Sequence, residues 1–297
     1  MIAVAVLSGT ATAAPPAETR FEKVEALGLD RISGTTPTWY VEGGKARGAY
    51  LRSILEHERR FFRRHTGDDI QVSLAVLDAS RWMKVEPDLP YGLPSISDPP
   101  RMALMPINWA EVNFLPMPDP DHADAGLLAS ARRAHLSWRR IIDIGADLII
   151  AHEFGHALAA TMGIDTEVSW FNELIAGYAL YAYTKGGRQD LVTPLELFYA
   201  YTETLPHRHS SLRYLDGHYT DILSNEPMNY GWYQGQLFAR IEEVYRHEGV
   251  EFLNEIRTDI KAKGKYTENT IFERLETLGP GWKAWSRSLE ESHRVGR

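Results

Sequence analysis

The sequence predicts an α+β protein: a small N-terminal mixed sheet with a helix packed on it, followed by a mainly helical lobe. Residues 70–77 alternate between apolar and polar side chains as a strand does, and residues 101–106 form a second short apolar run. Residues 45–65 instead carry apolar side chains at helical spacing. We therefore expect an α/β lobe over residues 20–145 and a helical lobe over residues 146–297, with a cleft between them.

The stretch between the two predicted strands, residues 87–100, is rich in proline and is predicted to be a loop. Pro106 closes the second strand, which places residues 101–106 at a sheet edge in this prediction. An edge strand beside a cleft can pair with an extended peptide, although a plain edge strand without a ligand fits the pattern equally well.

Composition limits the classes of function and of metal site. The net charge of -8 over 297 residues gives no support for a nucleic-acid partner, and we expect none. No segment after the N-terminus is apolar enough to predict a membrane span. The chain has no cysteine, so disulfides and thiolate metal sites are excluded. Any zinc must therefore be held by histidine, aspartate or glutamate.

Residues 1–14 form a short apolar run that contains Ala11-Thr12-Ala13, a sequence of the type cleaved by signal peptidases. This pattern predicts an export signal, and hence a secreted or periplasmic protein. The alternative is a disordered N-terminal tail, in which case the protein would be cytoplasmic.

The clearest motif is His152-Glu153-x-x-His156, inside a predicted helix bounded by Gly145 and Gly163. Residues four apart lie on one face of a helix, so both imidazoles would point to the same place, as in zinc metalloproteases. The surrounding residues are mostly apolar, so this helix is expected to be buried. Buried histidines need a partner, and a metal ion supplies one.

A second apolar helix is predicted over residues 169–181, joined to the first by a short turn that brings it back against the motif. Glu173 is the only acidic residue in this apolar stretch, so we expect it to be the third metal ligand. Asp165 and Glu167 are its rivals, but both lie in the connecting turn, where they would be solvated or would cap a helix.

The combination of His152-Glu153-x-x-His156 with Glu173 seventeen positions later resembles the gluzincin zinc metallopeptidases, the group of thermolysin and aminopeptidase N. It is most similar to compact bacterial proteins of the peptidase MA-like type, in which a tryptophan precedes the third ligand, as Trp170 does here. The resemblance implies a zincin-like fold. It also implies one zinc ion per chain, held by His152, His156 and Glu173.

The same resemblance implies that Glu153 is the general base on a zinc-bound water and that a tyrosine or histidine hydrogen-bonds the oxyanion. Residues 229–246 resemble the tyrosine-bearing helix of aminopeptidase-like gluzincins, although in a different register. Tyr230 and Tyr233 are therefore both candidates for the oxyanion donor, with aromatic packing as the alternative. His218 is a further candidate.

These expectations describe a zinc metallopeptidase that hydrolyses peptide or protein substrates. No glutamate of the kind that exopeptidases of this group use for the substrate amine is present in the candidate strands, so an endopeptidase is favoured. Two alternatives stay open. One is a non-catalytic peptide-binding or protein-binding protein that retains the gluzincin fold, against which the intact Glu153 argues. The other is a zinc hydrolase of a non-peptide amide or ester.

Overall fold

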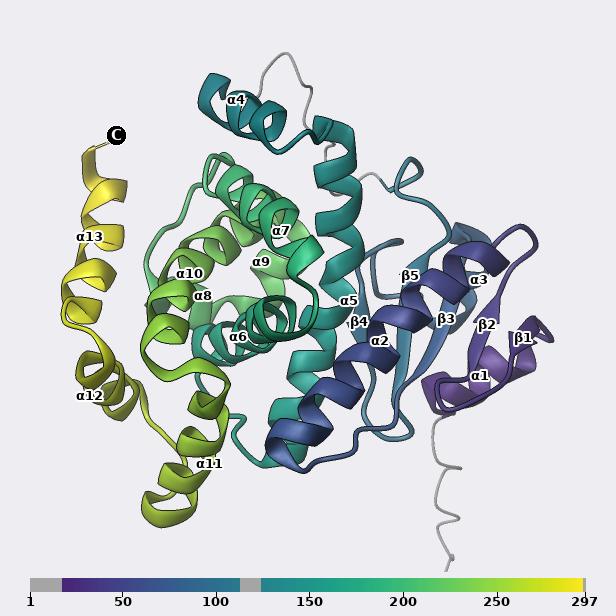
Figure 1. The fold of residues 1–297 in the computed structure, drawn as a ribbon, viewed down its shortest axis with the longest axis horizontal. Helices are drawn as coiled ribbons and strands as arrows, with labels where there is room; N and C mark the ends of the chain where they lie inside the picture. Colours follow the sequence, from purple (N-terminus) through teal and green to yellow (C-terminus); the bar gives the residue numbers. More distant parts are fainter. Residues whose placement is uncertain (1–17, 113–123, 296–297) are drawn as a thin grey trace, which may run out of the picture.

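The computed structural model describes residues 18–112 and 124–295 of the chain. In Figure 1 the sheet and its covering helices lie at one side of the molecule, and a body of helices extends from them to the C-terminus. This arrangement confirms the predicted α+β class, with the sheet near the N-terminus and the mainly helical part after it. The predicted export signal over residues 1–14 lies outside the described residues.

The five-stranded sheet has the order β1-β2-β3-β5-β4. Its strands are β1 (Asp30–Ile32), β2 (Thr38–Tyr40), β3 (Ser73–Leu77), β4 (Ser95–Ile96) and β5 (Met102–Pro106). Strands β2, β3 and β5 are parallel, and β1 and β4 are antiparallel to their neighbours. The sequence predicted β3 and β5, but it placed residues 101–106 at the edge, which is wrong. All five β5 residues are buried because β3 and β4 lie on either side.

The edge beside β5 is instead formed by β4, a two-residue strand inside the stretch that was predicted to be loop. The two faces of the sheet pack against different helices. Leu74 and Val76 of β3 belong to the core that includes α2 (Lys45–Thr66), the helix predicted over residues 45–65. Ala75 and Leu77 point to the other face, which α1 (Arg20–Ala26) and α3 (Ala79–Val85) cover. This alternation is the two-residue period of a strand with both faces buried.

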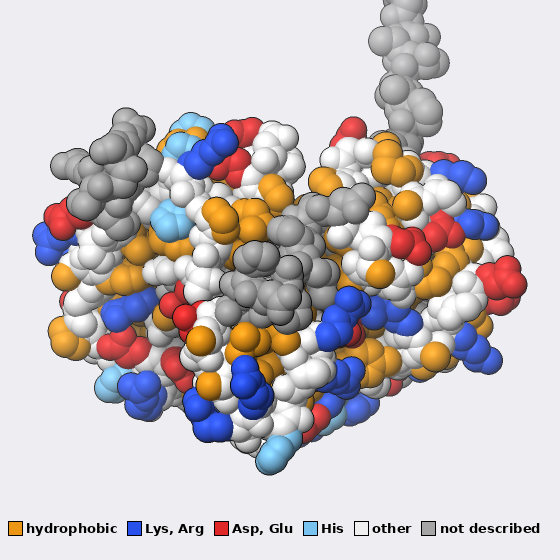
Figure 2. Space-filling model, turned by 90° about the horizontal axis from the view of Figure 1, so that it is seen from above, with side chains coloured by type: hydrophobic (Ala, Val, Ile, Leu, Met, Phe, Trp, Pro, Cys, Tyr) orange, Lys and Arg blue, Asp and Glu red, His pale blue; other side chains and the backbone are white. Residues whose placement is uncertain are grey.

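The remaining elements are helical. They are α4 (Ala125–Arg133), α5 (Trp138–Met162), α6 (Ser169–Gly187), α7 (Gln189–Thr202), α8 (Leu212–Gly217), α9 (Tyr219–Asn225), α10 (Pro227–Glu248), the 3-10 helix η2 (Gly249–Glu251), α11 (Phe252–Lys263), α12 (Glu268–Leu278) and α13 (Trp282–Val295). None of the helices in the described ranges combines the length and apolar character needed to cross a membrane. The face seen in Figure 2 carries both acidic and basic side chains.

The helix that carries the histidine motif is longer than predicted. Gly145 was expected to precede this helix, but it lies inside α5, where its missing side chain makes room for Phe198 of α7. Helix α5 begins at Trp138, and Ser137 caps it by accepting a hydrogen bond from the Arg140 backbone. The helical conformation is interrupted between α4 and α5, where His135 has a φ of 57°. The predicted lobe boundary between residues 145 and 146 therefore falls inside a helix.

Candidate metal centre

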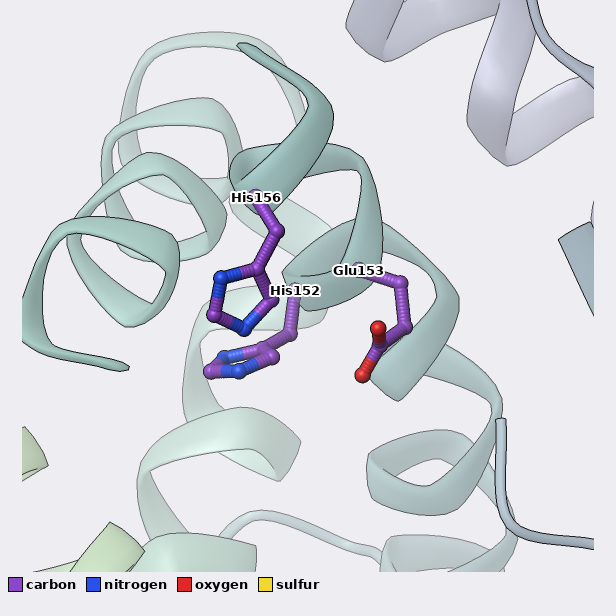
Figure 3. A group of neighbouring side chains, drawn as sticks. All are labelled: His152, Glu153 and His156. Atoms are coloured by element: carbon purple, nitrogen blue, oxygen red, sulfur yellow. The ribbon is translucent and has the colours of Figure 1, made fainter. Parts of the chain in front are cut away.

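Helix α5 brings the two motif histidines together. His152 and His156 lie one turn apart on the same face, with ring centroids 4.9 Å from each other. Figure 3 shows both rings side by side, with the Glu153 carboxylate beside them on the same helix. His152 is buried, whereas the His156 side chain is 31% exposed. The ligand atoms of these three residues all lie within 4.8 Å of one another.

Helix α6 adds the acidic group. Glu173 is buried, and its carboxylate faces both imidazoles. Its Oε2 lies 3.1 Å from Nε2 of His152, and its Oε1 lies 3.5 Å from Nε2 of His156. The spacing of α5 and α6 depends on Gly155, since a Cβ at that position would lie 2.7 Å from the Ala176 carbonyl oxygen. The turn between the helices starts at Gly163, which ends α5 with a φ of 69°.

The cluster could hold a metal ion, but its geometry is not specific to zinc. Nε2 of His152 and Oε2 of Glu173 form a hydrogen bond of 3.1 Å, and the other oxygen, Oε1, lies 3.5 Å from Nε2 of His156. Both distances are close to the roughly 3.4 Å that separates two ligand atoms of a tetrahedral zinc. Two imidazole nitrogens and a carboxylate oxygen are also a donor set that zinc accepts. The ligand atoms that lie close enough together to share a metal are those of His152, Glu153 and His156, and Glu173 contacts both histidines from α6. Both glutamates are therefore candidates for the third ligand.

Nδ1 of His152 is a buried polar atom of this group that lacks a hydrogen bond in the described part of the chain. A metal at Nε2 requires the proton on Nδ1, and histidine ligands usually donate that proton to a carboxylate or carbonyl. The Gly177 backbone of α6 lies in front of Nδ1, since a Cβ there would be 3.9 Å from it. Nε2, the other ring nitrogen, faces the Glu173 carboxylate.

Electrostatics couple these residues. Burial by itself would raise the pKa of Glu173, but the two histidines outweigh it and hold that pKa well below its usual range. Burial would likewise lower the pKa of His156, but the Glu173 carboxylate outweighs it and raises this pKa to about 9. Burial raises the pKa of Glu153, and the histidines oppose that shift only in part. A raised pKa makes Glu153 a stronger base.

Three further side chains donate hydrogen bonds to the Glu173 carboxylate. Tyr219 of α9 donates to Oε1. Tyr230 and Gln234, one turn apart on α10, donate to Oε2 at 2.9 and 2.5 Å. Burial, together with the Glu173 charge, raises the pKa of both phenols, so both stay protonated. Sequence reasoning found Tyr230 but missed the other two. Gln234 could have been found from its position four residues after Tyr230, whereas Tyr219 had no sequence signal.

The other residues considered from the sequence lie elsewhere. Tyr233 is fully buried, and its hydroxyl donates to the Ser211 carbonyl at 3.0 Å, so the structure does not bring it to the histidine motif. The ring of His218 stacks on Tyr214, with centroids 4.1 Å apart. Oδ2 of Asp165 lies 3.8 Å from Nζ of Lys265 at the surface, and Glu167 is exposed. Of the proposed oxyanion donors, only Tyr230 shares the site.

A pocket of about 280 Å³ opens beside the motif. His152, Glu153 and His156 form part of its wall, and Glu153 is the only acidic residue among the described residues that line it. Most of the remaining wall is apolar and comes from both parts of the molecule: Leu89, Leu93, Pro94, Ser95 and Ile96 from the β4 side, and Ile149, Phe198, Tyr199, Thr202, Tyr219, Leu223, Pro227, Tyr230, Gly231 and Gln234 from the helices. The pocket therefore lies between the sheet and the helical body.

Comparison with known proteins gave no match: no family model, no curated protein and no solved structure matches this chain.

Proposed function

We propose that this protein is a zinc-dependent metallopeptidase of the gluzincin type, with endopeptidase activity favoured. One observation carries the proposal. The Glu173 carboxylate on α6 lies 3.1 and 3.5 Å from the Nε2 atoms of His152 and His156 on α5, and these two histidines line a pocket together with Glu153. Hydrogen bonds alone would give similar distances, so the support lies in the convergence of two histidines and a carboxylate, a donor set that zinc accepts, beside the pocket.

In this proposal His152, His156 and Glu173 hold the zinc ion, which when bound supplies a Lewis acid and lowers the pKa of water. Glu153 accepts a proton from the attacking water and passes it to the leaving amine. The Tyr230 hydroxyl, which donates to Glu173 here, is the candidate donor to the oxyanion that forms on the substrate carbonyl. The apolar pocket wall accepts an uncharged side chain of the substrate.

Two features favour an endopeptidase. An aminopeptidase needs an acidic group for the free amine of its substrate, and the described pocket wall offers none besides Glu153. In addition, β4 has no neighbouring strand on its outer side among the described strands, and both of its residues line the pocket. An open edge of this kind can pair with the backbone of an extended peptide.

The first test is metal content, measured by elemental mass spectrometry on the purified protein and on Glu173→Ala. We expect about one zinc per chain in the wild type and a large loss in the variant, because two histidines alone bind zinc weakly. Glu153→Gln serves as the matched variant: it should keep its zinc but cleave a peptide library about 100-fold more slowly or worse.

The outcomes separate the alternatives. A wild type without zinc, even after zinc is added back, would contradict the proposal and favour a binding protein. A zinc-loaded wild type that leaves every peptide intact but hydrolyses simple esters or amides, in a manner that depends on Glu153, would favour a non-peptide hydrolase.

A further inference from the structure

Strand β4 is weakly held by the sheet itself. It consists of Ser95 and Ile96, which pair with Leu104 and Ala103 of β5. A two-residue strand at a sheet edge makes few ladder hydrogen bonds, so it needs other support to keep one position. Its position matters, because both of its residues line the pocket beside Glu153.

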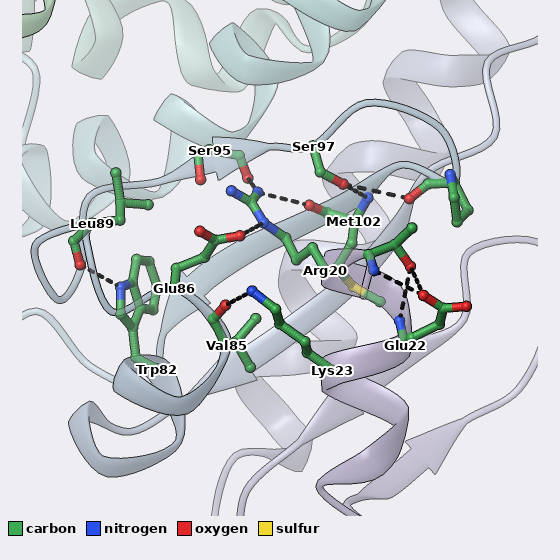
Figure 4. Close-up of polar contacts among 12 residues, drawn as sticks. Arg20, Glu22, Lys23, Trp82, Val85, Glu86, Leu89, Ser95, Ser97 and Met102 are labelled. Atoms are coloured by element: carbon green, nitrogen blue, oxygen red, sulfur yellow. Dashed lines mark hydrogen bonds and ion pairs between the residues drawn. The ribbon is translucent and has the colours of Figure 1, made fainter. Parts of the chain in front are cut away.

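Arg20 of the N-terminal helix α1 supplies this support. Its Nη1 donates to the carbonyl oxygens of Ser95 at 3.2 Å and Met102 at 3.1 Å. It thereby joins the end of residues 89–96, the pocket-lining segment, to the start of β5. Its Nε donates to the Glu86 carboxylate at 2.8 Å. The Arg20 side chain is only 10% exposed. Figure 4 shows its guanidinium between Glu86 on one side and the two backbone carbonyls on the other.

The chemistry of the side chain suits this role. A guanidinium is planar and presents several donors in a fixed arrangement, so it can bind two carbonyls and a carboxylate together. Hydrogen bonds from a charged donor are also stronger than those between neutral groups. A lysine in the same place would have a single nitrogen and could not reach all three partners equally well.

Lys23 provides a natural comparison on the same helix. Its Nζ donates to the Val85 carbonyl at 3.0 Å, which fastens α1 to the end of α3 but does not reach β4. The other end of the pocket-lining segment is fastened by Trp82, whose Nε1 donates to the Leu89 carbonyl at 3.0 Å. These contacts also appear in Figure 4. Arg20 is thus a charged side chain that binds β4 directly. Lys23 contributes only to the packing of α1 against α3.

We propose that Arg20 is a positioning residue for extended peptide substrates: it fixes β4 so that the open edge of this strand faces the cleft beside Glu153. This inference rests on the proposed peptidase function. Because Arg20 acts through the backbone of β4, its loss should weaken the binding of peptides long enough to lie along that strand. It should leave the zinc site unchanged and the chemical step nearly so, because Arg20 is only the smallest of the charges that act on the pKa of Glu153.

The test compares Arg20→Ala, Arg20→Lys and Lys23→Ala with the wild type, all loaded with zinc. The substrates are a fluorogenic peptide chosen from the library digest, which extends several residues on both sides of the cleaved bond, and a shortened form that keeps one residue on each side. For the long peptide we expect Arg20→Ala to raise KM about tenfold while kcat changes less than about threefold. The KM of the short peptide should not change, and Arg20→Lys should recover part of the loss.

Hydrogen exchange gives a readout that needs no substrate. In Arg20→Ala, backbone amides of residues 95–97 should exchange faster, while those of α5 keep their protection. Lys23→Ala should match the wild type at β4 and in both kinetic constants. Equal effects of Lys23→Ala and Arg20→Ala on the long peptide would overturn the inference, because they would show a general loss of α1 docking.

An unchanged KM for the long peptide in Arg20→Ala would also overturn it, with the peptidase proposal left standing. A wild type that binds no zinc and cleaves no peptide would overturn both proposals together, and that result is seen before any variant is measured.

Discussion

Two fully buried glutamates in this protein have opposite surroundings. Glu173 has five polar neighbours among the described residues: two histidines, two tyrosines and a glutamine. Glu58 of α2 is equally inaccessible, yet neither of its carboxyl oxygens has a hydrogen-bond partner in the described part of the chain. Partners hold the pKa of Glu173 well below its usual range, whereas burial raises the pKa of Glu58 well above its usual range. The same side chain therefore serves as a charged ligand candidate in one place and, in the other, as an unpaired carboxyl whose ionised form burial disfavours.

Glu58 should make the protein less stable as the pH rises. Its pKa is higher in the folded state than in the unfolded state, so the folded state binds the proton more tightly. Its penalty is smallest below the unfolded pKa, near 4.5, and grows as the pH rises toward the folded pKa. We expect Glu58→Met to increase the free energy of unfolding by about 1–3 kcal/mol at pH 8, and by less at pH 4.

Urea unfolding at the two pH values measures this difference. Comparing variant with wild type at each pH cancels the titration of the metal site, which both proteins share. Glu56→Gln on the same helix is the control, because its carboxylate is partly exposed and pairs with Arg52. It should change stability by less than about 1 kcal/mol, with no increase toward high pH. A gain for Glu58→Met that is equal at both pH values would contradict the assigned pKa shift.

At the level of secondary structure, the candidate site is assembled from four helices. Helix α5 supplies both histidines and Glu153, and α6 supplies Glu173. Helix α9 supplies Tyr219, and α10 supplies Tyr230 and Gln234 from consecutive turns. The close approach of α5 and α6 at Gly155 sets the distance between the histidines and the carboxylate, because any side chain at residue 155 would meet the Ala176 backbone. Backbone, unlike a flexible side chain, can move only with its whole helix.

Gly155→Ala should therefore damage both stability and metal binding. Its Cβ would lie 2.7 Å from the Ala176 carbonyl oxygen, so α6 would have to shift and carry Glu173 with it. We expect a loss of about 1–3 kcal/mol in the free energy of unfolding and roughly a tenfold or greater loss of zinc affinity. Gly217→Ala in α8 is the control, since a Cβ there meets nothing within 4 Å. Unfolding curves and zinc competition titrations measure both quantities, and wild-type zinc affinity in Gly155→Ala would refute the assigned role of this contact.

Across the whole molecule, the sheet and the helical body are joined through Asp147 of α5. This carboxylate lies 2.8 Å from Nη2 of Arg47 in α2 and accepts a hydrogen bond from Nε1 of Trp109 at 2.7 Å. Arg47 in turn donates to the carbonyl of Pro106 at the end of β5, at 2.7 Å. Asp147 precedes His152 by five residues, which is about 140° around the helix, so it lies on the face opposite the metal candidates. One helix thus links the sheet on one face and builds the site on the other.

Asp147→Asn should weaken the protein without emptying the metal site. Removing the charge leaves Arg47 nearly buried without its partner, so we expect a loss of about 2–3 kcal/mol in the free energy of unfolding at neutral pH. Zinc content should stay at the wild-type level. The control is Asp143→Asn, which breaks an exposed pair with Arg139 on the same helix and should cost less than about 1 kcal/mol. Loss of zinc from folded Asp147→Asn would show that the two faces of α5 are not independent.

The sequence by itself determined the local features of this protein. The period of apolar residues identified α2, β3 and the helical body, and the spacing of His152 and His156 placed two imidazoles on one helix face. Glu173 could be selected because an isolated acidic residue in an apolar helix requires a partner. These inferences succeed because helix and strand periods depend on neighbours in the chain.

Only the tertiary structure decided which distant residues meet. Tyr219 and Gln234 reach Glu173 from α9 and α10, and Tyr233 turns away although it lies only three residues after Tyr230. The edge strand is β4 and not the predicted β5. Strand order depends on pairing between distant segments, which the pattern within one strand does not reveal. The contact of Arg20 with Ser95 is of the same kind. A surface arginine and an arginine that binds the carbonyls of two strands look alike in sequence, and only folding shows which they are.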